Sequence, residues 1–363
     1  MIFCKENKST RIFLTIVIGI TGGFLFTFIH MPMPWMLGPM LALLIASNVI
    51  KIPLYWPTNL RNWSLIIIGY NSGQALTNEA LVQIFHQLPW MLILTIILIT
   101  FCAASAFLVC KFAHIDYLST LMGAIPGGLS QMVLLGEEIE SADLTVITLL
   151  QITRLMMIIF CIPMIAYSSL FSPGISANTA SIINPVVIPL HILLGKLLLF
   201  AVISTLCAFL AKKIKLPTPY LLGPIMGITL CNIFHLQGPE VPSFFLCMAQ
   251  FSMGAFLGLL LKPERFPNNL KTVSLYLLNG IILLLFSLGL SYILAITHGI
   301  TFLTAMLCMA PGGADQMSLI ASAMSADVSM VTGYQLFRIL FIYSIIPPVL
   351  KWFINRKFNN IGI

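Results

Sequence analysis

Long apolar stretches, separated by short polar loops, run along the whole chain. Two of them, 12–29 and 88–109, are long enough to cross a bilayer as helices, since about 20 apolar residues span its hydrocarbon core. The complete pattern predicts twelve apolar segments, near 12–30, 35–50, 62–77, 89–110, 117–136, 144–170, 186–211, 219–235, 243–261, 272–297, 301–323 and 328–350. The sequence therefore predicts an all-α polytopic membrane protein.

Composition supports the bilayer as the solvent of this chain. It has 363 residues, of which 59% are hydrophobic and only 8% are charged, whereas a soluble domain carries about 25% charged residues. The first apolar segment follows Lys5, Lys8 and Arg11, as in a signal peptide, but it is too long for a signal core and no small-residue cleavage site follows. We interpret it as the first membrane helix.

Three sequence blocks occur twice, in the same order. The motif "PGGLSQM" at 126–132 returns as "PGGADQM" at 311–317, and the shift from position 126 to position 311 is called the repeat offset below. The other pairs are "PMPWMLGPM" (32–40) with "LPTPYLLGPIM" (216–226), and "SADLTVITLLQITRL" (141–155) with "SADVSMVTGYQLFRI" (325–339). A nearly constant offset indicates an internal duplication. The predicted organisation is a cytoplasmic tail (1–11), membrane repeat 1 (12–170), a linker (171–185), membrane repeat 2 (186–350) and a basic cytoplasmic tail (351–363).

The positions of the basic residues favour repeats of opposite orientation. The net charge is +7, and the lysines and arginines cluster in loops. If all twelve segments crossed, the two repeats would share one orientation and basic loops would lie on both faces. If the two Pro-Gly-Gly segments enter and return on one side, each repeat crosses five times and every basic loop lies on the cytoplasmic face. We therefore predict two inverted-topology repeats with about ten transmembrane helices, two re-entrant hairpins and both termini in the cytoplasm.

Each Pro-Gly-Gly motif breaks a helix inside an apolar segment. Proline removes a backbone donor and glycine permits a turn, and in a bilayer such a break persists only when it packs in protein or lines a wet cavity. The helix that follows the break presents unpaired N–H groups and a positive dipole end, which suit an anion. The candidate substrate-binding residues are Pro126, Gly127, Gly128, Ser130 and Gln131 in the first copy, and Pro311, Gly312, Gly313 and Gln316 in the second. The alternative is a structural kink with an N-cap.

The two motifs differ at one informative position. Ser130 of the first copy corresponds to Asp315 of the second. A carboxylate in a buried helix opening can bind Na⁺ or take up a proton, because desolvation disfavours its charged form. Asp315 is therefore the candidate ion-coupling residue. The alternative is that it only caps its helix.

A polar stripe follows each motif and is also repeated. Its members are Asp143, Gln151 and Arg154 in the first copy, and Asp327, Gln335 and Arg338 in the second. An arginine at the centre of a membrane helix costs about 2.5–3.5 kcal/mol, so it should face the protein interior and find a partner. Gln151, Arg154, Gln335 and Arg338 are candidate ligands of an anionic substrate. The alternatives are packing of each arginine against the hairpin carbonyls and capping of helices by the two aspartates.

At these motifs the chain resembles the AbrB-duplication membrane family of Gram-negative bacteria. The resemblance rests on "PWMLGPM", "PTPYLLGP", "GAIPGGLSQM", "MAPGGADQMSLIA" and the paired "SAD…Q..R" blocks, and it spans residues 12–350. Family names range from transporter to AbrB-type regulator and ammonia monooxygenase. The resemblance implies a protein of the bacterial inner membrane and supplies no established active site.

The residues allow these family names to be weighed. A monooxygenase needs clustered metal ligands, but the six histidines are scattered and neither HExxH nor CxxC occurs. We therefore predict no metal, no cofactor and no enzyme activity. A DNA-binding regulator needs a polar basic module, and no polar segment here is long enough to fold as one. Nucleic acid is therefore not an expected partner.

The leading hypothesis is a secondary transporter of a small organic anion, coupled to H⁺ or Na⁺, that works by alternating access about the two crossed hairpins. The second hypothesis is a membrane regulator or sensor that acts indirectly on gene expression. A membrane enzyme is a third and weaker option. The expected partners are the lipid bilayer and the anion, and the sequence is also compatible with a homo-oligomer.

Overall fold

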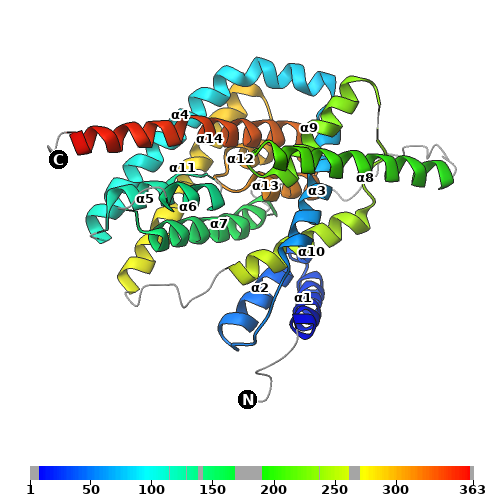
Figure 1. Ribbon diagram of the computed structural model, residues 1–363, viewed down its shortest axis with the longest axis horizontal. Coiled ribbons are helices and arrows are strands. Elements are labelled where there is room, and N and C mark those ends of the chain that lie inside the picture. The colour runs from blue at the N-terminus through cyan, green and yellow to red at the C-terminus, as the bar shows by residue number, and fades with distance from the viewer. Residues whose placement is uncertain are drawn as a thin grey trace. The chain divides into compact units, whose positions relative to one another are not determined.

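All regular elements in the described part of the chain are helices. The computed structural model describes residues 8–113, 115–127, 129–137, 142–167, 190–236, 238–260 and 270–359. These ranges contain fourteen helices and no strand (Figure 1). The helices are α1 (Lys8–Phe28), α2 (Pro34–Asn48), α3 (Thr58–Ala75), α4 (Asn78–Ala113), α5 (Tyr117–Ala124), α6 (Leu129–Glu137), α7 (Leu144–Tyr167), α8 (Leu190–Lys213), α9 (Pro219–Ile233), α10 (Ser243–Leu260), α11 (Leu270–His298), α12 (Phe302–Met309), α13 (Ala314–Ala323) and α14 (Val328–Asn359). The all-α prediction is confirmed.

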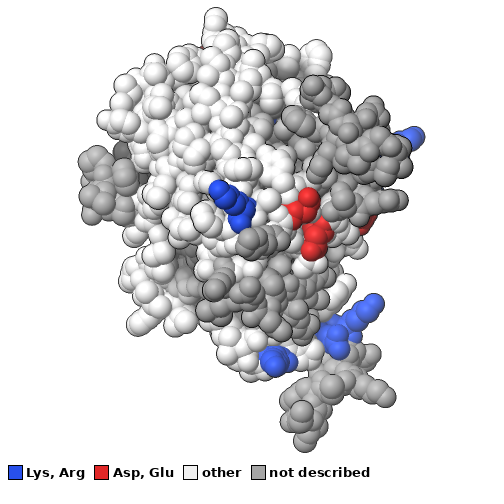
Figure 2. Space-filling view, turned by 90° about the vertical axis from the view of Figure 1, so that its left-hand side faces the viewer, with Lys and Arg blue, Asp and Glu red and all other residues white. Residues whose placement is uncertain are grey.

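Seven of the described helices are long and apolar enough to span a membrane, namely α1, α4, α7, α8, α10, α11 and α14. The shorter apolar helices α2 and α9 each begin with proline, Pro34 and Pro219, whose missing N–H is harmless in the first helical turn. Among the described residues on the face drawn in Figure 2, a few charged side chains stand in a largely uncharged surface. These features are consistent with a multi-pass membrane protein.

Both segments that contain Pro-Gly-Gly are divided into two short helices. The segment near 117–136 becomes α5 and α6, and the segment near 301–323 becomes α12 and α13. The first helix of each pair is capped by a side chain, since Asp116 accepts from the Ser119 N–H and Thr301 accepts from the Thr304 N–H. Helix α5 ends just before Pro126 and helix α12 just before Pro311, as expected because proline lacks a backbone donor.

The chain divides into two compact units that each combine segments from both predicted repeats. Unit 1 consists of Met1–Val82, Ile159–Glu264 and Ser318–Ser329, and so contains α1–α3 and α8–α10. Unit 2 consists of Gln83–Ile158, Arg265–Met317 and Met330–Ile363, and contains both Pro-Gly-Gly motifs. Most of the predicted N-terminal tail and the whole predicted linker lie outside the described residues.

Glycines let the helices of unit 1 approach closely. A Cβ added to Gly38 on α2 would collide with the backbone of Gly22 on α1, and one added to Gly223 on α9 would collide with the carbonyl of Cys207 on α8. Gly223 is the counterpart of Gly38 at the repeat offset, and Cys207 is the counterpart of Gly22. The same type of close contact therefore recurs with the same spacing as the sequence blocks.

A second pair of close glycine contacts in unit 1 also recurs at the repeat offset. On α10, Gly254 and Gly258 face the carbonyls of Met36 and Met40 on α2. On α3, Gly69 and Gly73 face the carbonyls of Leu221 and Ile225 on α9. At the repeat offset, Gly69 and Gly73 correspond to Gly254 and Gly258. The residues they face correspond in the same way, Met36 to Leu221 and Met40 to Ile225. Helices α2 and α10 thus pack as α9 and α3 do.

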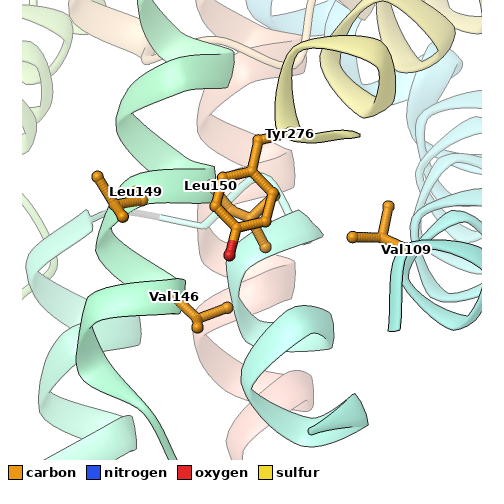
Figure 3. Close-up of a cluster of buried hydrophobic side chains, with 5 residues drawn as sticks. All are labelled: Val109, Val146, Leu149, Leu150 and Tyr276. Atoms are coloured by element: carbon orange, nitrogen blue, oxygen red, sulfur yellow. The ribbon is translucent and has the colours of Figure 1, made fainter. Parts of the chain in front are cut away.

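The core of unit 2 includes a cluster in which Tyr276 of α11 packs with aliphatic side chains. The cluster consists of Val109 on α4, Val146, Leu149 and Leu150 on α7, and Tyr276, all of them buried (Figure 3). It joins α7 to α4 and α11 over the two turns that precede Arg154. The cluster therefore fixes the position from which α7 presents its polar residues.

Candidate functional site

The second Pro-Gly-Gly break, between α12 and α13, is bound by two polar side chains of α14. The side-chain amide of Gln335 donates to the carbonyls of Leu307 at 2.7 Å, Ala310 at 3.2 Å and Cys308 at 3.4 Å. The guanidinium of Arg338 donates to the carbonyls of Ala310 at 2.8 Å, Met309 at 3.4 Å and Gly312 at 3.4 Å, and also to Gln335 Oε1. These carbonyls belong to the last turn of α12 and the residues just after it.

The first break, between α5 and α6, is bound in the same way by α7. Gln151 Nε2 donates to the carbonyls of Met122 at 2.8 Å and Ile125 at 2.9 Å. Arg154 Nη1 donates to the carbonyls of Ala124 at 2.8 Å and Gly123 at 3.3 Å, and Arg154 Nη2 donates to Gln151 Oε1 at 2.7 Å. The corresponding acceptors of the two breaks lie about one repeat apart in the chain.

These hydrogen bonds have a clear physical cause. The last carbonyls of a helix have no partner inside the helix, and that end carries a partial negative charge. A guanidinium and a side-chain amide supply the missing donors, and the positive charge favours the helix end. The contacts agree with the alternative in which each arginine packs against hairpin carbonyls. Substrate binding by Gln151, Arg154, Gln335 and Arg338 stays a prediction.

The two arginines form a buried centre of positive charge in unit 2. Arg154 is 5% exposed and Arg338 is 3% exposed, and the two guanidinium groups are close enough to repel each other. Within the described residues neither forms an ion pair, and the Nε–H of each has no hydrogen-bond partner. Within the described residues, the two positive charges are therefore offset by carbonyl dipoles and by the side-chain oxygens of Gln151 and Gln335.

Cys102 of α4 is a neighbour that the sequence did not single out. Its side chain is fully buried and lies within electrostatic range of both Arg154 and Arg338. Cys102 stands in an apolar run of the sequence, so its local context gives no sign of charged neighbours. One signal was available, since its counterpart at the repeat offset is Ser287, a polar residue that is also buried.

At the second break, Asp315 and Gln316 lie in the first turn of α13. Gln316 Nε2 donates to Asp315 Oδ2 at 3.0 Å. Gln316 is only 4% exposed, yet its Oε1 has no hydrogen-bond partner. A Cβ added to Gly313 would collide with both Gln316 Oε1 and Asp315 Oδ1, so the two oxygens point into the same small space. Gly313 leaves this space open.

The first glycine of each break is covered by a methionine side chain. A Cβ on Gly127 would meet the side chain of Met132, and one on Gly312 would meet Met317 Cε at 2.9 Å. Pro126 and Pro311 are both buried. Gly128 and the side chains of Ser130 and Gln131 lie outside the described residues. Their proposed contact with substrate stays a prediction.

Asp143 acts as a helix cap. Its Oδ1 accepts from the Thr145 N–H at 2.8 Å at the start of α7, and its own N–H donates to Ser119 Oγ at 2.8 Å. The capping interpretation of Asp143 is therefore confirmed. This contact also joins the start of α7 to the first turn of α5.

Other features of the described residues do not coincide with the predicted site. A pocket of about 300 Å³ is lined by Val133, Leu144, Thr145, Thr148 and Leu149. None of the predicted site residues lines it. Among the described residues, no group of three or more His, Cys, Asp or Glu side chains is arranged to hold a metal ion.

Comparison with known proteins covers almost the whole chain. A family model described as "Transition state regulatory protein AbrB" matches residues 35–354. The protein named "Uncharacterized protein YhjN" of Bacillus subtilis (strain 168) is 24% identical over 375 residues, which cover 95% of this chain and 93% of that protein. The protein named "Putative regulator AbrB" of Escherichia coli (strain K12) is 25% identical over 332 residues, which cover 91% of this chain and 92% of that protein. Both Pro-Gly-Gly breaks and both polar stripes lie inside the matched range.

Proposed function

The chain belongs to the AbrB family, and we propose that it is a secondary transporter of a small organic anion, coupled to H⁺ or Na⁺. The family predicted from the repeated motifs is thereby confirmed, whereas the transport role is our proposal. We place the protein in the bacterial inner membrane with both termini in the cytoplasm. Neither catalysis nor nucleic-acid binding is part of the proposed role.

The buried arginine pair is the observation that carries this proposal. A charge in a low-dielectric interior is costly unless it is paired and hydrogen-bonded. Arg154 and Arg338 are both buried, repel each other and have no acidic partner among the described residues. Their hydrogen bonds to carbonyls reduce this cost only in part. A small anion near the two helix breaks would supply the missing negative charge, and the helix N-termini there would add favourable N–H groups.

The repeated contacts support the architecture that alternating access requires. Glycine-to-carbonyl contacts in unit 1 recur at the repeat offset, and the arginine and glutamine contacts in unit 2 recur at or close to it. We therefore propose two inverted-topology repeats, with about ten transmembrane helices and two re-entrant hairpins that carry the breaks. In transporters built this way, broken helices from both repeats form the binding site near the middle of the membrane.

Uptake into proteoliposomes tests the proposal. The purified full chain is reconstituted and offered radiolabelled pyruvate, malate and citrate under imposed H⁺ and Na⁺ gradients. We expect accumulation of at least one of these anions, and a loss of more than tenfold in Arg338→Gln. Lys196→Ala, at an exposed position of α8, is the matched control and should transport normally.

The outcome also separates the second hypothesis from the first. Thermal stabilisation of the reconstituted protein by one of these anions, without uptake or exchange, would identify a membrane sensor in place of a transporter. Normal uptake in Arg338→Gln would show that the arginine pair is not the binding centre.

A further inference from the structure

The first turn of α13 brings a carboxylate and an amide together in an incomplete hydrogen-bonding arrangement. Gln316 Nε2 donates to Asp315 Oδ2 at 3.0 Å, which is one ordinary hydrogen bond. On the other side of the same pair, Gln316 Oε1 has no partner although its residue is only 4% exposed. Asp315 Oδ1 points into the same space beside Gly313. Two acceptor oxygens therefore converge there, and the amide oxygen lacks a donor.

A buried acceptor without a donor is unfavourable, because it loses its hydrogen bonds to water. An ionised Asp315 cannot correct this, since a carboxylate only accepts. A proton on Asp315 Oδ1 does correct it, because the resulting O–H can donate to Gln316 Oε1. The amide and the acid are then joined by two hydrogen bonds in a closed ring. Gln316 thus favours the protonated form of its neighbour.

We infer that Asp315 is the proton-carrying residue of this protein and that Gln316 stabilises its protonated form. This inference rests on the proposed function, and it selects H⁺ over Na⁺ as the coupling ion. The oxygens nearest to a Cβ at Gly313 are Gln316 Oε1 and Asp315 Oδ1, which are fewer oxygens than a metal cation usually takes. The carbonyls of Ala310 and Gly312 already accept from Arg338, so they are less available as ligands of a metal cation. A proton needs only one acceptor, which Gln316 provides.

The surrounding charges link protonation to anion binding. Arg338 of α14 donates to the carbonyl of Gly312, and in the described residues it interacts electrostatically with Arg154 from α7, Cys102 from α4 and Cys308 from α12. Asp315 lies three residues after Gly312, whose carbonyl accepts from Arg338, so an ionised Asp315 would repel an anion bound beside that arginine. Protonation removes that negative charge and leaves the arginines available to an anion. Proton and anion should therefore bind cooperatively, since each binding event favours the other.

The first break does not repeat this arrangement. Ser130 stands where the second copy has Asp315, although Gln131 corresponds to Gln316. A hydroxyl does not titrate in the physiological range. The sequence therefore provides one proton site of this kind for each chain, which predicts one proton for each transport cycle.

Infrared difference spectroscopy on the full chain in liposomes tests the inference without any transport. The pH is titrated, and the carbonyl-stretch band of protonated carboxyl groups is recorded. We expect a band that disappears in Asp315→Asn and shifts to lower titration pH in Gln316→Met, which keeps the side-chain volume but removes the amide acceptor. Asp116→Asn, at an exposed cap of α5, is the matched control and should leave the band unchanged.

Each outcome decides between named alternatives. An unchanged band in Asp315→Asn would overturn the proton site, whether or not the protein transports. Loss of the band on addition of NaCl at constant pH, with KCl as control, would assign the site to Na⁺ instead. A band that belongs to Asp315 in a protein that takes up no anion would retain the proton site and refute the transporter. Asp315→Asn mimics the protonated acid, so its anion uptake or binding should lose its pH dependence.

Discussion

Phe101 of α4 and Phe286 of α11 stack face to face, with ring centroids 3.7 Å apart and an angle of 5° between the ring planes. The two phenylalanines are counterparts, since the repeat offset separates them in the sequence. If the repeats are related by a two-fold axis, residues that correspond to each other can touch only where that axis passes between them. The stack therefore marks the expected position of the axis in unit 2, where α4 and α11 meet.

The Phe101–Phe286 stack should be energetically coupled. Aromatic pairs contribute about 0.5–1.5 kcal/mol beyond the area they bury, so the Phe101→Leu and Phe286→Leu variants should show a coupling energy of that size in a double-mutant cycle. The measurement is reversible unfolding of the purified protein in mixed micelles. Phe101→Leu combined with Phe24→Leu, which lies in the other unit, should be additive. Additivity of the stacked pair would show that the two rings do not interact in solution.

The close helix contacts of unit 1 should make Gly254 intolerant of a side chain. A Cβ at this position would collide with the Met36 carbonyl, so Gly254→Ala should lower the free energy of unfolding by about 1–3 kcal/mol, the usual cost of overpacking. Gly289→Ala on α11 is the matched control, because a Cβ there would meet nothing within 4 Å. It should be neutral or stabilise by about 0.5–1 kcal/mol, as Ala replaces Gly in a helix interior. Equal effects of the two substitutions would contradict the packing.

Gln335 should stabilise the C-terminal end of α12 through its hydrogen bonds to the last carbonyls. Gln335→Leu removes a donor to the carbonyls of Leu307, Cys308 and Ala310. The Ala310 carbonyl keeps its bond from Arg338, and the loss of the donor to the other two should cost about 1–3 kcal/mol. The expected result is faster amide hydrogen exchange in residues 307–313, measured by mass spectrometry. Tyr334→Phe, which removes a hydrogen bond to Gln87 on α4, is the control and should leave exchange in that range unchanged. Uniform acceleration across the chain would indicate general destabilisation instead.

The proposed topology predicts opposite sides of the membrane for two loops. With five crossings in each repeat, residues 137–142 should face the cytoplasm and residues 171–184 the opposite side. Single cysteines placed in each stretch of a cysteine-free variant should react with a membrane-impermeant maleimide from opposite sides of right-side-out vesicles. Labelling of residues 137–142 from the outside would exclude the first re-entrant hairpin, because full crossing by residues 117–136 would place this loop there.

Much of the architecture can be predicted from the sequence, because it depends on local rules. The length and apolarity of each segment predict its helix, and the Pro-Gly-Gly motifs at Pro126 and Pro311 predict where two of the segments break. The capping of α7 by Asp143 also follows from a local pattern. The sequence further indicated that Arg154 and Arg338 need partners in the protein interior.

The partners themselves were decided only by the tertiary structure. A sequence shows that Arg338 must find acceptors, but the carbonyls it reaches are available only because α12 ends beside α14. Similarly, glycine spacing shows that α3 and α10 each allow a close neighbour, but not that α3 packs on α9 and α10 on α2. Periodicity along a chain describes each helix singly, whereas these contacts depend on which helix faces meet, and side-chain packing between distant segments selects them.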